Sequence, residues 1–387
     1  MAGVEASLYW RLSFFYLFYF ASIGIMVPFW SLYLKSINFS ALEIGQLSAV
    51  LMGTKIIAPY VWAWISDHTG YRMRIVRVAS VLSLLCFLGV FFGQQFWWLV
   101  AVTFLFSFFW NANLPQFEAT TLTHLGEDTH RYSMIRLWGS VGFVIAVLLI
   151  GSWLETVGAG RVPILMSYML LAIAVMSFLT PEVKKHVASH EHISIRSVLR
   201  QPVVMALFAV CFLLQASHGP YYAFYTIYLE DNGYSRSLIG FLWALGVLAE
   251  ILVFLVMHKW LPRFGVRKLM MVALTLSALR WVVMGSFVQH HFVMILIQLL
   301  HAASFGVYHS VSIHMIHKYF PGKLQGRGQA LYSSLSFGAG GAAGALYSGY
   351  VWDSIGPGFA FSSAAGLCVI AWLFAWRYFP RHPQAAI

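Results

Sequence analysis

Long apolar stretches alternate with short polar connections along the whole chain of 387 residues. A helix that crosses the hydrocarbon core of a bilayer needs about 20 mostly apolar residues. About twelve windows of this kind follow one another, and the connections leave no room for a soluble domain. We therefore predict an all-α integral membrane protein with twelve transmembrane helices, centred near residues 21, 53, 86, 108, 144, 171, 214, 246, 277, 304, 340 and 368.

The composition supports a membrane protein. Hydrophobic residues make up 60% of the chain and charged residues 10%, whereas a soluble domain carries about 25% charged residues. The first window starts near Leu8, exceeds signal-peptide length and has no small-residue cleavage site, so we expect a retained helix. The three cysteines lie singly in apolar windows, which indicates neither a metal or redox motif nor a disulfide framework.

Lysine and arginine lie mainly in alternate connections. The connections after even-numbered windows hold fifteen of them: Arg72, Arg74, Arg77, Arg131, Lys184, Lys185, Arg196, Arg200, Lys259, Arg263, Arg267, Lys268, Lys318, Lys323 and Arg327. The opposite connections hold only Lys35, Arg161 and Arg236. The positive-inside rule then predicts that both termini are cytoplasmic. The net charge of +11 is explained by topology, and no nucleic-acid partner is expected.

The sequence also repeats itself at an offset of 195 residues. Residues 40–47 (SALEIGQL) match 235–242 (SRSLIGFL), and residues 70–72 (GYR) match 265–267 (GVR). This repeat predicts two six-helix halves, residues 1–181 and 202–387, joined by a cytoplasmic linker at 182–201. Parallel repeats of this size are typical of secondary transporters, with the substrate site at the midplane between the halves.

Few ionisable side chains lie inside the predicted spans. A charge at mid-membrane costs roughly 2.5 kcal/mol or more, so such groups normally face the protein interior and have a function there. The set comprises Lys55, Glu118, Arg136, Glu250 and Arg280, with His218, His301, His309 and His314.

Their spacing predicts which of these groups meet. Glu118 and Arg136 are equidistant from Glu127 in the loop between their helices, so an antiparallel pair places both about 13 Å deep. Glu250 and Arg280 are likewise equidistant from Gly265. Either pair could serve transport or could simply hold two helices together.

Small residues follow Arg136 at Gly139, Ser140 and Gly142. They predict a close helix contact rather than direct binding of a ligand. For Lys55 a functional and a structural role stay equally open. The histidines at 186, 190 and 192 lie in the solvated linker without other ligands, so no metal site is expected.

The segment 215–225 (QASHGPYYAFY) interrupts an apolar window at Gly219-Pro220. Interrupted helices line transporter cavities, which favours a binding site here, with a gate hinge as the alternative. The polar and aromatic side chains that gather there are Gln215, His218, Tyr221 and Tyr222.

Residues 66–74 (SDHTGYRMR) resemble the loop signature of the major facilitator superfamily. Asp67, Gly70 and Arg72 fit the signature, while Ala63 stands where its first glycine would be. The resemblance implies a conformational latch, so these three residues are expected to act in gating.

Residues 136–143 (RLWGSVGF), with an acid eighteen residues earlier, resemble the lactose/proton symporter branch of that superfamily. There the matching Glu–Arg pair binds sugar. Phe143 stands in place of the tryptophan that stacks on the sugar. In the segment 298–304 (QLLHAAS) the histidine of that branch is kept as His301, but Ser304 replaces the proton-carrying carboxylate.

Longer segments resemble the bacterial phenylpropionate permease group, namely 27–35 (VPFWSLYLK), 136–143, 240–250 (GFLWALGVLAE), 279–285 (LRWVVMG) and 298–305 (QLLHAASF). The resemblance implies a monomeric importer of a small aromatic carboxylate such as 3-phenylpropionate, in the bacterial cytoplasmic membrane. It would be driven by the proton gradient without a cofactor.

A guanidinium matches a carboxylate as a two-pronged fork, and aromatic side chains would hold the ring. The predicted substrate-binding residues are Glu118, Arg136, Phe143, Gln215, His218, Tyr221, Tyr222 and Arg280, with Lys55 as a further cation. Proton coupling is predicted first for Glu250, and then for Glu118 and His301.

Two other functions stay open. A proton-coupled oligosaccharide or nucleoside symporter would use Glu118 and Arg136 for hydroxyl groups. A transporter-like sensor would bind a ligand without moving it. An enzyme is not expected, because the sequence shows no nucleophile–base set and no metal constellation.

Overall fold

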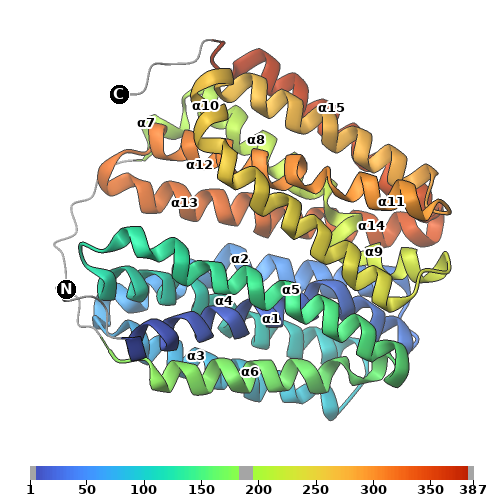
Figure 1. Cartoon of the computed structure of the whole chain (residues 1–387), viewed down its shortest axis with the longest axis horizontal. Coiled ribbons are helices and arrows are strands. Elements are labelled where there is room, and N and C mark those ends of the chain that lie inside the picture. The colour runs from blue at the N-terminus through green and yellow to red at the C-terminus, as the bar shows by residue number, and fades with distance from the viewer. Residues whose placement is uncertain (1–5, 183–194, 382–387) are drawn as a thin grey trace. The chain divides into compact units, whose positions relative to one another are not determined.

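A computed structural model describes residues 6–182 and 195–381, and in these residues all regular structure is helical (Figure 1). The helices of the first half are α1 (Ala6–Ser36), α2 (Ala41–Thr69), α3 (Arg72–Phe87), α4 (Phe96–Leu125), α5 (Tyr132–Val157) and α6 (Val162–Leu179). The short α7 (Arg196–Leu199) precedes α8 (Pro202–Ser217), α9 (Gly219–Asp231), α10 (Arg236–Ser286), α11 (His291–Gln298), α12 (Tyr308–Tyr319), α13 (Gln325–Ser333), α14 (Gly341–Ser354) and α15 (Pro357–Tyr378).

The twelve predicted spans are confirmed. Ten helical stretches of the described chain are long and apolar enough to cross a membrane. One of them, α10, contains two predicted windows, because its 51 residues change direction at Gly265. The remaining window is α13, a π-helix at Ser334–Gly340 and α14, where frequent glycine and serine lower the hydropathy.

The predicted repeat is visible in the backbone. The described residues with positive φ fall into corresponding pairs: Asn38 with Gly233 and Gly70 with Gly265 at an offset of 195, then Gly126 with Gly322 and Gly158 with Gly356 at nearly the same offset. Gly70 (φ 71°) and Gly265 (φ 74°) turn the chain in the left-handed region that favours glycine. The loop signature and its echo therefore adopt the same local conformation.

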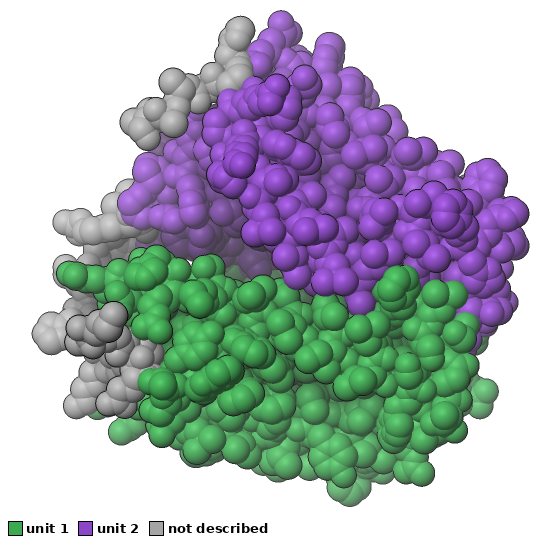
Figure 2. Space-filling view, viewed as in Figure 1, with its two compact units in different colours: residues 1–39, 54–190, 235–241 green, residues 40–53, 191–234, 242–387 purple. Residues whose placement is uncertain are grey.

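Residue contacts divide the chain into two compact units, coloured separately in Figure 2. Unit 1 comprises Met1–Phe39, Thr54–His190 and Ser235–Phe241, and unit 2 comprises Ser40–Gly53, Glu191–Tyr234 and Leu242–Ile387. The start of α2 (Ser40–Gly53) thus belongs to unit 2, and the start of α10 (Ser235–Phe241) belongs to unit 1. The two segments begin 195 residues apart, which is the offset of the repeat. Most of the predicted linker at 182–201 lies outside the described residues, and the predicted division into halves stays a prediction.

Close helix contacts at glycine explain this exchange of segments. In unit 2, Gly45 of α2 lies against Gly349 of α14, and a Cβ on Gly45 would lie 2.8 Å from the Gly349 Cα. In unit 1, Gly151 of α5 lies against Gly240 of α10, and a Cβ on Gly151 would lie 3.3 Å from the Gly240 Cα. Only residues without a side chain allow backbones to approach so closely.

We expect Gly45→Leu to lower the free energy of unfolding by about 1–3 kcal/mol, because added atoms overpack a closed contact. The nearest obstacle to a Cβ is the Ala345 carbonyl oxygen at 2.7 Å, which belongs to backbone and cannot swing aside. The measurement is thermal unfolding of the purified protein in detergent. Gly53→Leu on the same helix is the matched control, since no atom lies within 4 Å of a Cβ there. Equal unfolding of the two variants would contradict the proposed contact.

Candidate functional site

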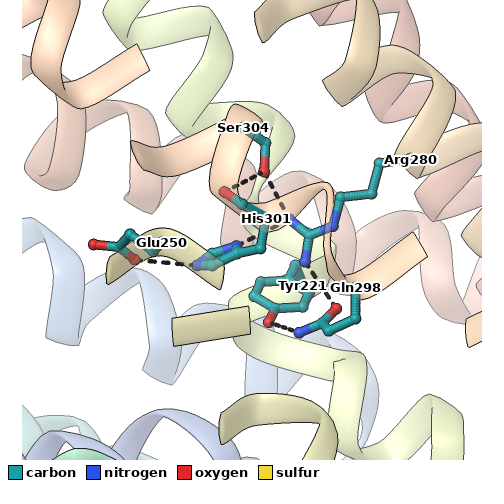
Figure 3. A network of polar contacts seen from close by, with 6 residues as sticks. All are labelled: Tyr221, Glu250, Arg280, Gln298, His301 and Ser304. Atoms are coloured by element: carbon teal, nitrogen blue, oxygen red, sulfur yellow. Dashed lines mark hydrogen bonds and ion pairs between the residues drawn. The ribbon is translucent and has the colours of Figure 1, made fainter. Parts of the chain in front are cut away.

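Arg280 is completely buried and is the centre of a polar network in unit 2 (Figure 3). Its Nη1 lies 3.1 Å from His301 Nδ1 and donates to Ser304 Oγ at 2.9 Å. Its Nη2 donates to Gln298 Oε1 at 3.1 Å, and Gln298 Nε2 donates to the Tyr221 hydroxyl at 2.6 Å. The guanidinium therefore meets three neutral acceptors rather than a carboxylate in direct contact.

Aromatic rings contribute the rest of the Arg280 environment. The guanidinium carbon lies 4.3 Å from the Tyr221 ring centroid and 4.6 Å from that of Trp281. Ring faces carry partial negative charge and attract a cation, more strongly where water is absent. The Nε atom of Arg280 is buried without a hydrogen-bond partner. Neutral groups thus only partly compensate the buried charge.

His301 connects Arg280 to Glu250. An arginine has only donors, so His301 Nδ1 must accept from Arg280, and the proton of a neutral imidazole then lies on Nε2. That Nε2 faces Glu250 Oε2 at 3.7 Å. Equal spacing about Gly265 predicted that Glu250 and Arg280 lie at similar depth, and the structure places the His301 imidazole between the two charges. Glu250, with its side chain 16% exposed, lies at the more accessible end.

Helix geometry explains why three acceptors meet one arginine. Gln298, His301 and Ser304 recur every three residues, which places them on one helix face. A π-helix begins directly after His301 and spans Ala302–Val307. Such wide turns are frequent at functional sites. The spacing of Gln298 and Ser304 was visible in the sequence, but their role as partners of Arg280 was not predicted.

The predicted interruption at Gly219-Pro220 is slight. α8 ends at Ser217 and α9 begins at Gly219, yet His218 between them keeps φ −80° and ψ −3°, and residues 202–231 form one span. Gln215, His218 and Tyr221 are buried there, while Tyr222 is half-buried. Gln215 Nε2 and His218 Nε2 lack hydrogen-bond partners. In the described structure this segment is packed interior, with two polar atoms left unsatisfied.

Unit 1 contains the second predicted charge pair. Arg136 Nε lies 3.6 Å from Glu118 Oε1, with the two side chains 30% and 35% exposed. The Arg136 guanidinium also covers the Phe20 ring at 3.8 Å from its centroid. The predicted meeting of Glu118 and Arg136 is confirmed, and both side chains stay partly accessible. The role of Phe20 was not predicted, because it lies more than a hundred residues away in the chain.

The glycines after Arg136 have the predicted packing role. A Cβ on Gly142 would collide with the Leu17 backbone of α1, so α1 and α5 are in close contact there. A Cβ on Gly139 would lie 2.8 Å from Arg136 Nη1 and 2.7 Å from the Phe20 ring. Gly139 therefore also leaves space for the guanidinium on the ring.

The remaining predicted site residues lie on α2, α3 and α5 and in the turn between α2 and α3. Phe143 is buried in α5, and Lys55 is half-buried in α2. Asp67 lies in the last turn of α2 and Arg72 begins α3, with Gly70 in the turn between them. An unpredicted acid, Glu182, accepts hydrogen bonds from the Met73 and Arg74 backbone nitrogens at 2.9 and 3.0 Å.

Glu182 thus places a negative charge at the α3 N-terminus, where the helix dipole favours it. The predicted gating loop is thereby tied to the chain that follows α6. Among the described residues no group of three potential metal ligands occurs, and the histidines at 186, 190 and 192 lie outside them.

Comparisons with known proteins agree over nearly the whole chain. Residues 9–363 match the family model described as the MFS_1 like family. A protein of Escherichia coli (strain K12) named probable 3-phenylpropionic acid transporter is 32% identical over 364 residues, covering 89% of this chain and 91% of that protein. The maltose permease of Geobacillus stearothermophilus is 26% identical, covering 92% and 90%. A crystal structure of a mutant of the nucleoside transporter NupG shares the fold, with a TM-score of 0.85, 14% identity and coverage of 96% and 100%.

Proposed function

This chain belongs to the MFS_1 like family of secondary transporters, and we propose that it is a proton symporter importing a small aromatic carboxylate such as 3-phenylpropionate. Membership confirms the resemblance inferred from residues 66–74 and from the longer matching segments. The name of the Escherichia coli relative supports the substrate class. The observation that carries the proposal is the buried Arg280–His301–Glu250 series.

The charge balance of this series supports proton coupling. With Arg280 charged, His301 neutral and Glu250 ionised, the formal charges of the three side chains sum to zero. A proton on Glu250 leaves one uncompensated positive charge in a low-dielectric interior, which is costly. The Glu118–Arg136 pair is neutral by itself, so a substrate carboxylate bound there adds one negative charge and the two clusters together become neutral again. In this proposal, proton and anion each favour binding of the other. Transport of one proton with one monoanion is electroneutral.

Arg136 is the cation proposed to bind the substrate carboxylate. Its side chain is 30% exposed, whereas Arg280 is completely buried by its own partners. The Phe20 ring beneath the guanidinium offers an apolar surface beside the charge. Phe143, Tyr221 and Tyr222 are proposed to shape the aromatic surroundings of the ring, with Gln215 and His218 as polar neighbours.

The remaining proposals follow from topology and family. The protein is a multi-pass membrane transporter, proposed to lie in the bacterial cytoplasmic membrane with both termini in the cytoplasm. We propose that it works as a monomer by alternating access, with Asp67, Gly70 and Arg72 in the gating loop. The proton gradient drives it without a cofactor, and it catalyses no chemical reaction.

The test is uptake of labelled 3-phenylpropionate by cells that express this chain, first with an inward proton gradient and then with a protonophore. We expect accumulation that collapses with the protonophore. The uncharged 3-phenylpropionamide should not compete, because it lacks the carboxylate that the guanidinium recognises. Absence of uptake, with the protein present in the membrane, would overturn the proposal.

A second candidate is a proton-coupled oligosaccharide or nucleoside symporter. The observation that favours it is the partly exposed Glu118–Arg136 pair, since a carboxylate accepts and a guanidinium donates hydrogen bonds to hydroxyl groups. The names of the maltose permease and of the nucleoside transporter with the same fold agree with it. Uptake of labelled maltose or uridine, with none of 3-phenylpropionate, would favour this candidate.

A further inference from the structure

A groove of about 420 Å³ lies on unit 2 where the second part of α10 runs beside α15. Figure 1 shows the two helices side by side, and the Arg267 guanidinium donates a hydrogen bond to the Trp376 carbonyl oxygen across the contact. The groove is separate from both polar clusters described above. Its wall includes the cations Arg267, Lys268 and Arg381 and the apolar Met271, Leu276 and Trp372, together with Val272 and Thr275.

The described residues that line this groove carry positive charge and no negative charge. No acidic side chain lines it, and within residues 6–182 and 195–381 none of its three cations forms an ion pair. The Lys268 ammonium lies over the Phe264 ring, 5.3 Å from its centroid. Lys268 and Arg381 are exposed, so both are accessible to a ligand. The ligand chemistry that complements such a wall is an anion.

The apolar part of the wall determines what kind of anion fits. From Lys268 to Leu276 the helix advances about 12 Å, at ~1.5 Å per residue. One leaflet of a ~30 Å hydrocarbon core is about 15 Å deep. The groove thus runs from a charged end to an apolar end over nearly the thickness of one leaflet. In the orientation proposed above, its charged end lies at the cytoplasmic surface.

We propose that this groove binds an anionic phospholipid of the cytoplasmic leaflet. The phosphate lies among Arg267, Lys268 and Arg381, and an acyl chain lies along Met271, Leu276 and Trp372. Basic pockets between transmembrane helices on the cytoplasmic side recognise anionic headgroups in this way. A soluble phosphate compound would use the cations but would leave the apolar wall uncovered.

The experiment measures lipid retention by native mass spectrometry of the purified protein in mild detergent. Phosphatidylglycerol is titrated against phosphatidylcholine with matched acyl chains. We expect preferential retention of phosphatidylglycerol, and about thirtyfold weaker retention in the double variant Lys268→Gln/Arg381→Gln, since each surface cation contributes roughly fivefold. Both residues are exposed, and thermal unfolding verifies that the variant remains folded.

The matched control is Arg263→Gln/Arg377→Gln, which removes two exposed cations of the same two helices, α10 and α15, that do not line the groove. It should retain phosphatidylglycerol as the wild type does. Val272→Trp, which fills the apolar wall, should weaken lipid retention without removing a charge. Equal retention of both lipids, or equal loss in the control, would overturn the proposal. Displacement by an equal concentration of glycerol 3-phosphate would also overturn it, in favour of a soluble phosphate ligand.

Discussion

Arg280→Met should destabilise the protein by about 3–5 kcal/mol, the largest stability effect that we expect of any single substitution here. Removing the guanidinium takes the donor from His301 Nδ1, Ser304 Oγ and Gln298 Oε1 together. A buried acceptor without a donor costs roughly 1–3 kcal/mol. The cation–π contacts with Tyr221 and Trp281 are lost as well. Thermal unfolding in detergent measures the change.

Two further variants test this explanation. Arg280→Lys keeps the charge, but its compact ammonium lacks the planar fork that reaches acceptors on two sides, so intermediate stability is expected. Arg161→Met removes an exposed arginine and should change stability by no more than about 0.5 kcal/mol. If Arg280→Met unfolded at the wild-type temperature, the network would not contribute to stability.

Glu250→Gln should abolish gradient-driven accumulation while sparing exchange of substrate across the membrane. Glutamine preserves the size of the side chain but cannot take up a proton, so the net charge of the network can no longer change. With one proton per substrate, a gradient of one pH unit supports about tenfold accumulation, and the variant should only equilibrate. Reconstituted vesicles measure both quantities, accumulation from an imposed pH gradient and exchange between equal pools.

The control for this experiment is Glu127→Gln, in an exposed loop outside both clusters. It should accumulate substrate as the wild type does. Loss of exchange together with accumulation, in folded Glu250→Gln, would count against a purely proton-coupling role. Unchanged accumulation in the Glu250→Gln variant would show that another group carries the proton, with Glu118 and His301 as the remaining candidates.

Arg280→Met and Glu250→Gln test the two ends of one polar network. Arg280 is held by neutral partners in the dry interior, so its loss is expected to appear first as instability. Glu250 lies at the more accessible end, so its loss is expected to appear as uncoupling in a stable protein. A network that only held helices together would show instability for both and uncoupling for neither.

The spans, the repeat and one charge pair could be predicted from short windows of the sequence and from spacing along the chain. Twelve spans followed from apolar windows, because a bilayer requires about 20 apolar residues regardless of their partners. The repeat was readable from short matches, and the positive-φ pairs bear it out. Glu118 and Arg136 were paired correctly because two helices joined by a short loop must lie antiparallel, so equal distance from the loop means equal depth.

Spacing along the chain also placed Glu250 and Arg280 at similar depth about Gly265, but it did not show that an imidazole lies between them. Equal depth about Gly265 does not decide which faces of two helices meet, and a side chain from a third helix can come between them. His301 does so, with Gln298 and Ser304 on the same face. The slight interruption at His218 was likewise not decidable from Gly219-Pro220 alone, because proline is compatible with the first turn of a helix.

By itself the sequence determined the fold class, the number of spans, the repeat and the set of embedded charges, since each depends on composition and spacing along one chain. Only the tertiary structure decided that Arg280 is buried among neutral acceptors, that Glu250 contacts it through an imidazole, and that three cations gather over an apolar groove between α10 and α15. Those features depend on how side chains from distant helices are oriented toward one another. Periodicity places a residue at a depth, but only the packing of several helices determines what surrounds it.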